Sequence, residues 1–244
     1  MSHRSGDAPP RLPHGYTNAT FTERSASSGE PTVVKRYLGP DREERQGREL
    51  WALQALAGRF PVPPLLEHDS SRIVTGYLAG VPGQELLERM PVPVLHEVGR
   101  AARRLHGTDL GESLGQSREG SVLLHGDFGP QNMLFDASGH LAALVDWEFA
   151  HLGDPIEDLA WAEWIVRTHH PHLIDALGAL FDGHEIHPPW SQRHSAMLAT
   201  CAGLLAFARR WSAESAGVWQ RRIEATEAFA ESRRDRNRLA GLPP

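Results

Sequence analysis

The chain has 244 residues, 40% of them hydrophobic and 23% charged, which are the proportions of a globular protein large enough to bury a full core. The formal net charge of −6 argues against a general nucleic-acid-binding protein and mildly favours a cationic partner. The single cysteine, Cys201, excludes an internal disulfide and is typical of a reducing compartment.

Residues 1–11 are polar and proline-rich, which predicts a flexible leader. They lack the apolar stretch of a secretion signal, and the longest apolar run of the chain is too short to span a bilayer. We therefore expect a cytoplasmic protein with no membrane partner and no nucleic-acid partner, while the oligomeric state stays open.

The first predicted strands surround the only lysine of the chain. Thr32–Tyr37 is rich in β-branched residues and follows a turn at Ser25–Pro31 and a short alternating run at Ala19–Arg24, which predicts a hairpin. Of the 25 basic residues, 24 are arginine and only Lys35 is lysine. Because a compact ammonium is not interchangeable with a guanidinium in a narrow site, Lys35 is a candidate functional residue.

A helix follows the lysine strand. Pro40–Ala57 has helical periodicity, with Leu50, Leu53 and Leu56 at the expected buried positions, and the prolines of Phe60–Pro64 end it. The next strands are expected at Leu65–Glu67 and Arg72–Thr75, and the next helices at Gln84–Met90 and Val94–His106, with Gly107 as a left-handed cap.

Three short apolar runs lie at the centre of the chain and are short enough to be strands. They are Val122–Leu124, Met133–Phe135 and Leu141–Val145. The turn residues of Asp136–Gly139 join the last two runs into a hairpin, which places Asn132 near its start and Asp146 just past its end. Asp127 leaves the first strand at the same edge. Three oxygen-bearing side chains are therefore expected to converge.

This set of side chains suits phosphoryl transfer. A carboxylate and an amide oxygen, here Asp146 and Asn132, can hold Mg²⁺, which takes its remaining ligands from substrate phosphates and water. A second carboxylate, Asp127, can orient an attacking hydroxyl and accept its proton. The ordinary alternative for any one of these aspartates is a solvated turn.

The motifs HGD-x4-N, DWE and GDPIEDLAW resemble the aminoglycoside phosphotransferase and choline kinase-like branch of the protein-kinase fold. The resemblance implies an α+β fold with two lobes. Residues 12–78 would form a small N-lobe with an antiparallel sheet, and residues 79–244 a mostly helical C-lobe. ATP and Mg²⁺ are the implied cofactors, with the nucleotide between the lobes.

The resemblance also assigns roles to residues. Asp127 corresponds to the catalytic base, and Asn132 and Asp146 correspond to the metal ligands. Lys35 lies where the family has its phosphate-binding lysine, and Glu49 lies where the family has the carboxylate that pairs with this lysine. Glu44 is the alternative partner because the register of the helix is uncertain by about one turn.

Further nucleotide contacts are implied at two turns. Gly15, in the turn before the first strand, would let the backbone approach the phosphates. Gly76, Tyr77 and Leu78 lie where the family has the hinge between the lobes, whose backbone would bind adenine.

The remainder of the chain is expected to be helical. Asp154, Pro155 and Glu157 form a helix start with a capping box. The next residue, Asp158, fits either an ordinary dipole role or a brace for the catalytic loop. Three apolar residues of this helix are expected on one face, and two long helices follow. The apolar residues are Trp161, Trp164 and Ile165, and the helices are Ser191–Ala208 and Ala213–Ala230.

The expected function is transfer of the γ-phosphate of Mg-ATP to a hydroxyl of a small molecule, such as an aminoglycoside-like antibiotic or a hydroxylated metabolite. Only 18 residues separate His106 from His125, so we expect a shallow, open acceptor cleft that also admits Ser or Thr of a peptide. Glu148, Glu157 and Glu163 are candidates to meet a cationic acceptor, and solvated surface positions are the equal alternative for them. The alternative from another functional class is a pseudokinase that binds nucleotide and acts as a scaffold.

Overall fold

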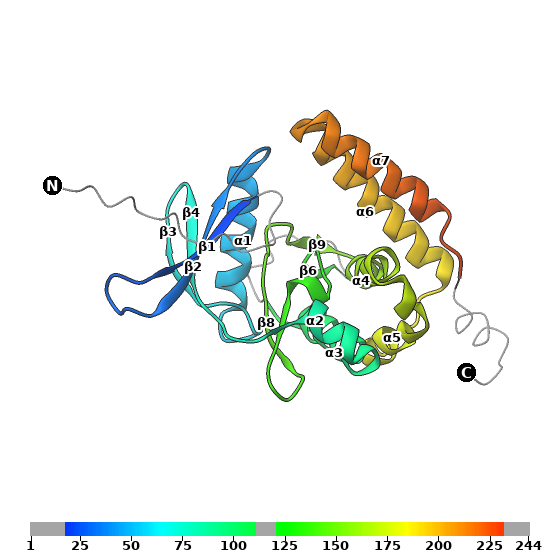
Figure 1. Cartoon of the computed structure of the whole chain (residues 1–244), viewed down its shortest axis with the longest axis horizontal. Helices are drawn as coiled ribbons and strands as arrows, with labels where there is room; N and C mark the ends of the chain where they lie inside the picture. The colour runs from blue at the N-terminus through cyan, green and yellow to red at the C-terminus, as the bar shows by residue number, and fades with distance from the viewer. Residues whose placement is uncertain (1–17, 111–120, 232–244) are drawn as a thin grey trace.

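The N-terminal part of the fold is an antiparallel sheet with one helix (Figure 1). The computed structural model describes residues 18–110 and 121–231. The strand order is β1-β2-β4-β3, all antiparallel, with α1 between β2 and β3 in the chain. The bounds are β1 (Asn18–Arg24), β2 (Pro31–Tyr37), α1 (Arg42–Leu56), β3 (Leu65–His68) and β4 (Arg72–Gly76).

Helix α1 contacts the sheet through β2 and β4. Its fully buried apolar side chains are Ala52, Leu53 and Leu56, whereas Leu50 is only partly buried against the core. The observed buried face of the helix is thus rotated slightly from the face that the leucines alone indicated. This packing fixes the helix against the strand that carries Lys35.

The rest of the described chain is mostly helical and lies beside the sheet (Figure 1). Its short strands form two small sheets, of order β5-β7-β8 and β6-β9. The strands are β5 (Val81–Pro82), β6 (Val122–Leu124), β7 (Met133–Phe135), β8 (Leu141–Leu144) and β9 (His151–Gly153). The α-helices are α2 (Gly83–Arg89), α3 (Pro91–His106), α4 (Ile156–His169), α5 (Gly178–His184), α6 (Trp190–Trp211) and α7 (Ala213–Glu227). The 3₁₀ helices are η2 (Pro130–Asn132) and η3 (Pro171–Ala176).

Two helix pairs organise this part. Helices α3 and α5 pack so closely that a Cβ on Gly183 would lie 2.1 Å from the carbonyl oxygen of His96, so only glycine fits at this crossing. Helices α6 and α7 form a long antiparallel pair, drawn in yellow and orange in Figure 1, and α6 also packs on α4.

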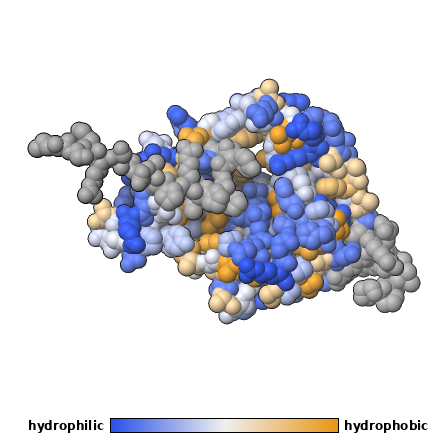
Figure 2. Space-filling view, in the orientation of Figure 1, coloured by the Kyte–Doolittle hydropathy of each residue, from blue (hydrophilic) through white to orange (hydrophobic). Residues whose placement is uncertain are grey.

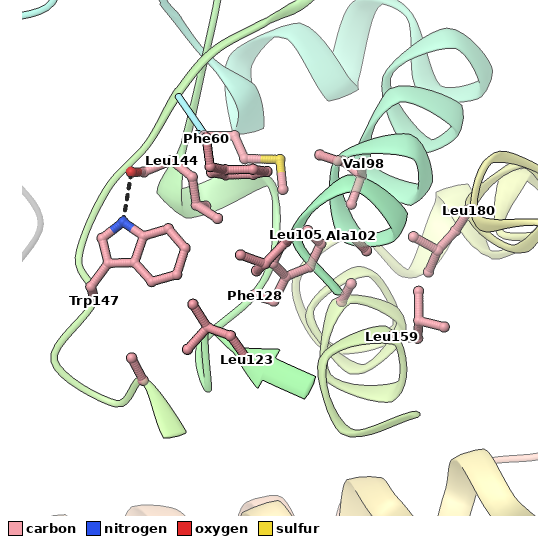
Figure 3. Close-up of a cluster of buried hydrophobic side chains, with 14 of the residues drawn as sticks. Phe60, Val98, Ala102, Leu105, Leu123, Phe128, Leu144, Trp147, Leu159 and Leu180 are labelled. Atoms are coloured by element: carbon pink, nitrogen blue, oxygen red, sulfur yellow. Dashed lines mark hydrogen bonds between the residues drawn. The ribbon is translucent and has the colours of Figure 1, made fainter. Parts of the chain in front are cut away.

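The main core joins the small sheets to α3, α4 and α5. Figure 3 shows Trp147 at one edge of this cluster, with its indole N–H donating to the carbonyl oxygen of Leu144 at 2.9 Å. Phe60 meets the Trp147 ring edge to face, at 6.1 Å between centroids. The core therefore anchors the residue next to Asp146.

Cys201 is buried, as its apolar neighbours indicate, and burial raises the pKa of its thiol to about 11. On the face in Figure 2, hydrophilic residues predominate and hydrophobic ones lie in small groups. Within residues 18–110 and 121–231, none of the helices combines the length and apolar character that a membrane crossing requires.

One local expectation needs correction, and several short elements were not expected. Gly107 has φ −90°, so it is not a left-handed cap. Its N–H donates to the carbonyl oxygen of Arg103, and the N–H of Thr108 donates to the carbonyl oxygen of Leu105. Strand β9 and helix α5 were not expected, because a three-residue strand and a seven-residue helix carry too little periodicity to detect.

Candidate active site

The β7–β8 hairpin brings Asn132 and Asp146 to the same end. Met133 pairs with Leu144, so the chain continues from this pair directly into Asn132 on one side and Val145 and Asp146 on the other. The N–H of Val145 donates to the carbonyl oxygen of Asn132 at 2.9 Å and extends the register by one step. The turn residues and the apolar runs were sufficient to predict this arrangement.

Asp127 receives three N–H donors on its side chain. The indole of Trp161 donates to Oδ1 at 2.7 Å, the amide of Gln131 donates to the same oxygen at 3.2 Å, and the amide of Asn132 donates to Oδ2 at 2.9 Å. Asn132 also donates to the Asp127 carbonyl oxygen at 2.8 Å. The carboxylate is therefore held in one orientation.

The backbone that carries Asp127 is supported from helix α4. The carboxylate of Asp158 accepts from the backbone N–H groups of His125 and Gly126 at 2.9 and 3.0 Å, and from the His106 ring at 3.2 Å. Gly126 has φ +80°, and a Cβ there would lie 2.2 Å from the carbonyl oxygen of Phe149. Of the two readings of Asp158, the contacts favour the brace.

Helix α4 begins near the predicted start, with one bond of the predicted capping box: Glu157 accepts from the N–H of Asp154 at 3.0 Å. Asp154 accepts from the N–H of Ile156 at 2.9 Å instead of from that of Glu157. This start fixes the first turn of α4 and therefore the position of Asp158.

Lys35 lies between Glu49 and Asp146. Its Nζ is 2.5 Å from Glu49 Oε2, forms a short ion pair with Asp146, and is 3.8 Å from Glu148 Oε2. Glu49 also accepts from the Tyr37 hydroxyl at 2.6 Å. Glu44 pairs instead with Arg48 on the exposed face of α1, so Glu49 is the partner of Lys35.

The electrostatics of Asp127 and Asp146 differ. Burial raises the pKa of the Asp127 carboxyl, although its hydrogen bond from Trp161 opposes this effect. Burial, the largest single effect, would raise the pKa of Asp146, but the charge and hydrogen bond of Lys35, together with the nearby His125 and Arg45, lower that pKa overall. Asp146 has φ +70°, a left-handed conformation that is uncommon outside glycine and better tolerated by Asp. A carboxyl with a raised pKa suits proton transfer, and one with a lowered pKa suits cation binding.

Glu148 joins the helical part to the sheet part. Its Oε2 accepts from Arg45 Nη1 of α1 at 2.7 Å and from Asn18 Nδ2 of β1 at 2.7 Å. Arg45 and Glu148 are buried, with 1% and 2% of their surfaces exposed. We name this set, Asn18, Arg45 and Glu148, the inter-lobe tie.

The end of α6 contacts the sheet part as well. Arg210 Nη1 donates to Asp41 Oδ1 at 2.8 Å, just before α1. The ring of Trp211 packs directly on Gly39, where a Cβ would overlap it. The lobes are thus in contact on the side of the α6–α7 pair.

The acidic groups considered for a cationic acceptor are engaged within the protein. Glu148 belongs to the inter-lobe tie, and Glu163 lies between Arg167 and Arg193, at 2.8 and 2.5 Å. Glu157 caps helix α4 and also lies 3.2 Å from His151. The expectation that they meet an acceptor is therefore wrong for the two buried glutamates.

The remaining candidate residues lie at the edges. Gly76 ends β4, and Tyr77, half exposed, donates its backbone N–H to Pro31 at 3.2 Å. Leu78 follows in the connection toward β5. Gly15 and the leader of residues 1–11 lie outside the described residues.

The donor set fits Mg²⁺ rather than a metal that prefers nitrogen or sulfur. Within the described parts of the chain, no group of three or more His, Cys, Asp and Glu side chains could hold a metal by itself. Mg²⁺ needs only one or two protein oxygens besides phosphate and water. Asp146 supplies a carboxylate, and Asn132 uses its amide N–H toward Asp127, so its carbonyl oxygen is the atom left for a cation.

Sequence reasoning missed several residues of this site, among them Gln131, which donates to Asp127. Trp161 was expected only on an apolar face and His106 only at a helix end, and no role was expected for Arg45. A buried tryptophan needs a partner for its N–H, which was the one available signal for Trp161. Arg45 and His106 find theirs at Glu148 and Asp158, far along the chain, so no local pattern indicated them.

One protein-family model matches the central part of the chain. The model of the family described as "Phosphotransferase enzyme family" matches residues 114–193, which include the Asp127, Asn132 and Asp146 positions. No curated protein matches the chain.

Solved structures with the same fold include three of interest. Aminoglycoside phosphotransferase APH(4)-Ia has a TM-score of 0.69 and 17% identity, covering 91% of this chain and 94% of that one. A choline/ethanolamine kinase family protein from Mesorhizobium loti has a TM-score of 0.63 and 19% identity, and the match covers 96% of this chain and 92% of that one. Macrolide 2′-phosphotransferase MphH from Brachybacterium faecium has a TM-score of 0.59 and 19% identity, and the match covers 91% of this chain and 92% of that one. The expected α+β, protein-kinase-like fold is confirmed, and the family model matches the segment that carries the predicted motifs.

Proposed function

We propose, on the premise that the chain has the fold and the central motif of the small-molecule phosphotransferases, that it transfers the γ-phosphate of Mg-ATP to a hydroxyl of a small molecule. The observation that carries the proposal is the pairing of Lys35 with Glu49 and Asp146, beside a carboxylate, Asp127, held by three N–H donors. The nucleotide would lie between the lobes of residues 12–78 and 79–244, with its adenine at the hinge of Gly76, Tyr77 and Leu78.

The chain's own residues would act mainly by position and charge, since phosphoryl transfer needs little covalent chemistry from the protein. Lys35 would bind phosphate oxygens, with Glu49 fixing its ammonium. Asp146 and Asn132 would hold Mg²⁺, which neutralises phosphate charge when it is bound. Asp127 would orient the acceptor hydroxyl and take its proton, and Asp158 would keep the Asp127 backbone in place.

The acceptor is proposed to be a hydroxylated antibiotic or metabolite. Structures with the same fold have been solved with antibiotics bound: a thermostable mutant of APH(4)-Ia with hygromycin B and AMP-PNP, and APH(2″)-IIa with gentamicin. We expect a panel of aminoglycosides, macrolides, choline and ethanolamine, together with a metabolite extract, to yield one product heavier by a phosphoryl group. Incubation with Mg-ATP followed by mass spectrometry tests this. If none of these compounds gains phosphate, or if Ser/Thr peptides tested in parallel are the only substrates, the small-molecule proposal is wrong.

A labelling experiment tests the place of Lys35. Lys35 and the N-terminal amine are the only primary amines of the chain. An ATP acyl-phosphate probe should acylate Lys35, and excess Mg-ATP should prevent this while leaving the N-terminal amine equally reactive. Peptide mass spectrometry provides the readout.

The control for this experiment is Lys35→Arg, which keeps the charge. It should remove the label and also impair turnover, because the wider guanidinium does not replace an ammonium between two carboxylates. Equal labelling of Lys35 with and without Mg-ATP would place this lysine outside the nucleotide site.

A further inference from the structure

Trp161 stands out because it is an aromatic core residue with a polar contact to the candidate base. Its ring stacks on Trp164, with centroids 4.3 Å apart and planes at 5°, and only 4% of Trp161 is exposed. Its indole N–H donates to Asp127 Oδ1 at 2.7 Å, across 34 residues of sequence. This is the shortest of the three donor contacts to the Asp127 side chain.

The number of donors limits how Asp127 can meet an acceptor. A carboxylate has about four acceptor positions on its two oxygens. Trp161 and Gln131 both donate to Oδ1, whereas Asn132 donates to Oδ2. Among the described residues, therefore, Oδ2 has one donor fewer than Oδ1 and is the oxygen with an open position.

Rotation of the carboxylate would break the Trp161 contact. The indole cannot follow such a rotation, because its ring is fixed in a stack with Trp164, and Trp219 extends the stack with its centroid 6.2 Å from that of Trp161. The rigidity of the aromatic stack is thereby transmitted to one oxygen of Asp127.

We propose that Trp161 is a positioning residue for the catalytic base, holding Asp127 Oδ1 so that Oδ2 faces the acceptor hydroxyl. This inference rests on the proposed function. Trp161 contacts Asp127 and is not proposed to contact the nucleotide or the reacting atoms. Its effect is to fix the orientation in which the Asp127 carboxylate accepts the proton.

The chain offers a matched control on the same helix. Trp164 is also buried, belongs to the same stack, and donates its indole N–H to Thr226 Oγ1 at 2.8 Å, away from Asp127. Trp161→Phe and Trp164→Phe thus each remove one indole N–H and keep an aromatic ring. Only the first removes a donor from the base.

The kinetic test uses Mg-ATP with water as the acceptor, measured as phosphate release, and also any acceptor found in the panel. Trp161→Phe should lower kcat by roughly ten-fold with KM for Mg-ATP unchanged, because a charge-assisted hydrogen bond to the base is lost while the nucleotide contacts stay. Trp164→Phe keeps an aromatic ring in the stack and removes no donor from Asp127, so it should lower kcat much less than Trp161→Phe does, even if it unfolds at a lower temperature. Equal kcat values for the two variants would overturn the positioning role.

A spectroscopic test is independent of the acceptor. The seven tryptophans of ¹⁵N-labelled protein give seven indole signals, assigned by single Trp→Phe changes. Asp127→Asn should move the Trp161 signal and leave the Trp164 signal in place, whereas Thr226→Val should do the reverse. A Trp161 signal that ignores Asp127→Asn would overturn the inference.

Failure of the two proposals can be told apart. If the parent has no measurable Mg-ATP turnover, or if Asp127→Ala keeps it, the proposed function is wrong and the role of Trp161 falls with it. If Asp127→Ala is inactive but Trp161→Phe equals Trp164→Phe in kcat, only the role of Trp161 is wrong.

Discussion

Replacing Asp127 with alanine should lower turnover by roughly 10²–10⁴-fold, the usual contribution of a general base. The Kd for Mg-ATP should change little, because the proposed nucleotide contacts come from Lys35 and Asp146 rather than from Asp127. Steady-state kinetics with the identified acceptor, together with calorimetric titration of Mg-ATP, measures both quantities.

Two variants serve as controls for Asp127→Ala. Asp136 lies in the exposed turn of the β7–β8 hairpin and caps only local N–H groups, so Asp136→Ala should keep turnover near the parental value. Asp146→Asn should instead weaken Mg-ATP binding itself, and Asn tolerates the left-handed backbone at this position. Parental turnover in Asp127→Ala would show that another group accepts the proton.

Replacing Glu163 with glutamine should cause a large loss of stability. Glu163 is fully buried between Arg167 and Arg193, which are only 5% and 2% exposed. Neutralising it removes the carboxylate that both buried guanidinium groups contact, and breaking such a buried pair costs about 3–5 kcal/mol. Tm should fall by roughly 10 °C for a chain of this size, as measured by calorimetry or circular dichroism.

The matched control is Glu44→Gln. Glu44 forms an exposed ion pair with Arg48 one turn along α1, and such pairs contribute about 0.5 kcal/mol or less. A Glu163→Gln protein as stable as the Glu44→Gln protein would mean that the two buried arginines find other compensation.

Local patterns predicted the centre of the site because its geometry is local. A turn at Asp136–Gly139 between two apolar runs determines the hairpin register, and the register determines that Asn132 and Asp146 share one end. The distinction between Glu49 and Glu44 needed the structure, because one helical turn separates positions that the sequence leaves equivalent.

The parts that the sequence did not reveal depend on contacts between distant segments. Arg45 stands next to Glu43 and Glu44 in a charged stretch typical of a solvated face, yet it is buried by Glu148, 103 residues later. The contact between Trp161 and Asp127 depends on how α4 is set against the loop after β6. Helical periodicity reports which face of a helix is buried, but it carries no information on where a polar atom of that face is aimed.

The inter-lobe tie has a consequence for how the protein should melt. Arg45 of the sheet part is buried against Glu148 of the helical part. Separating the lobes would therefore break this buried ion pair. Trp211 and Arg210 would at the same time leave Gly39 and Asp41. The sheet and the helices are therefore expected to lose structure together, in one calorimetric peak whose van't Hoff enthalpy equals the measured heat. Arg45→Leu, which removes the charge that links them, should split that peak into two.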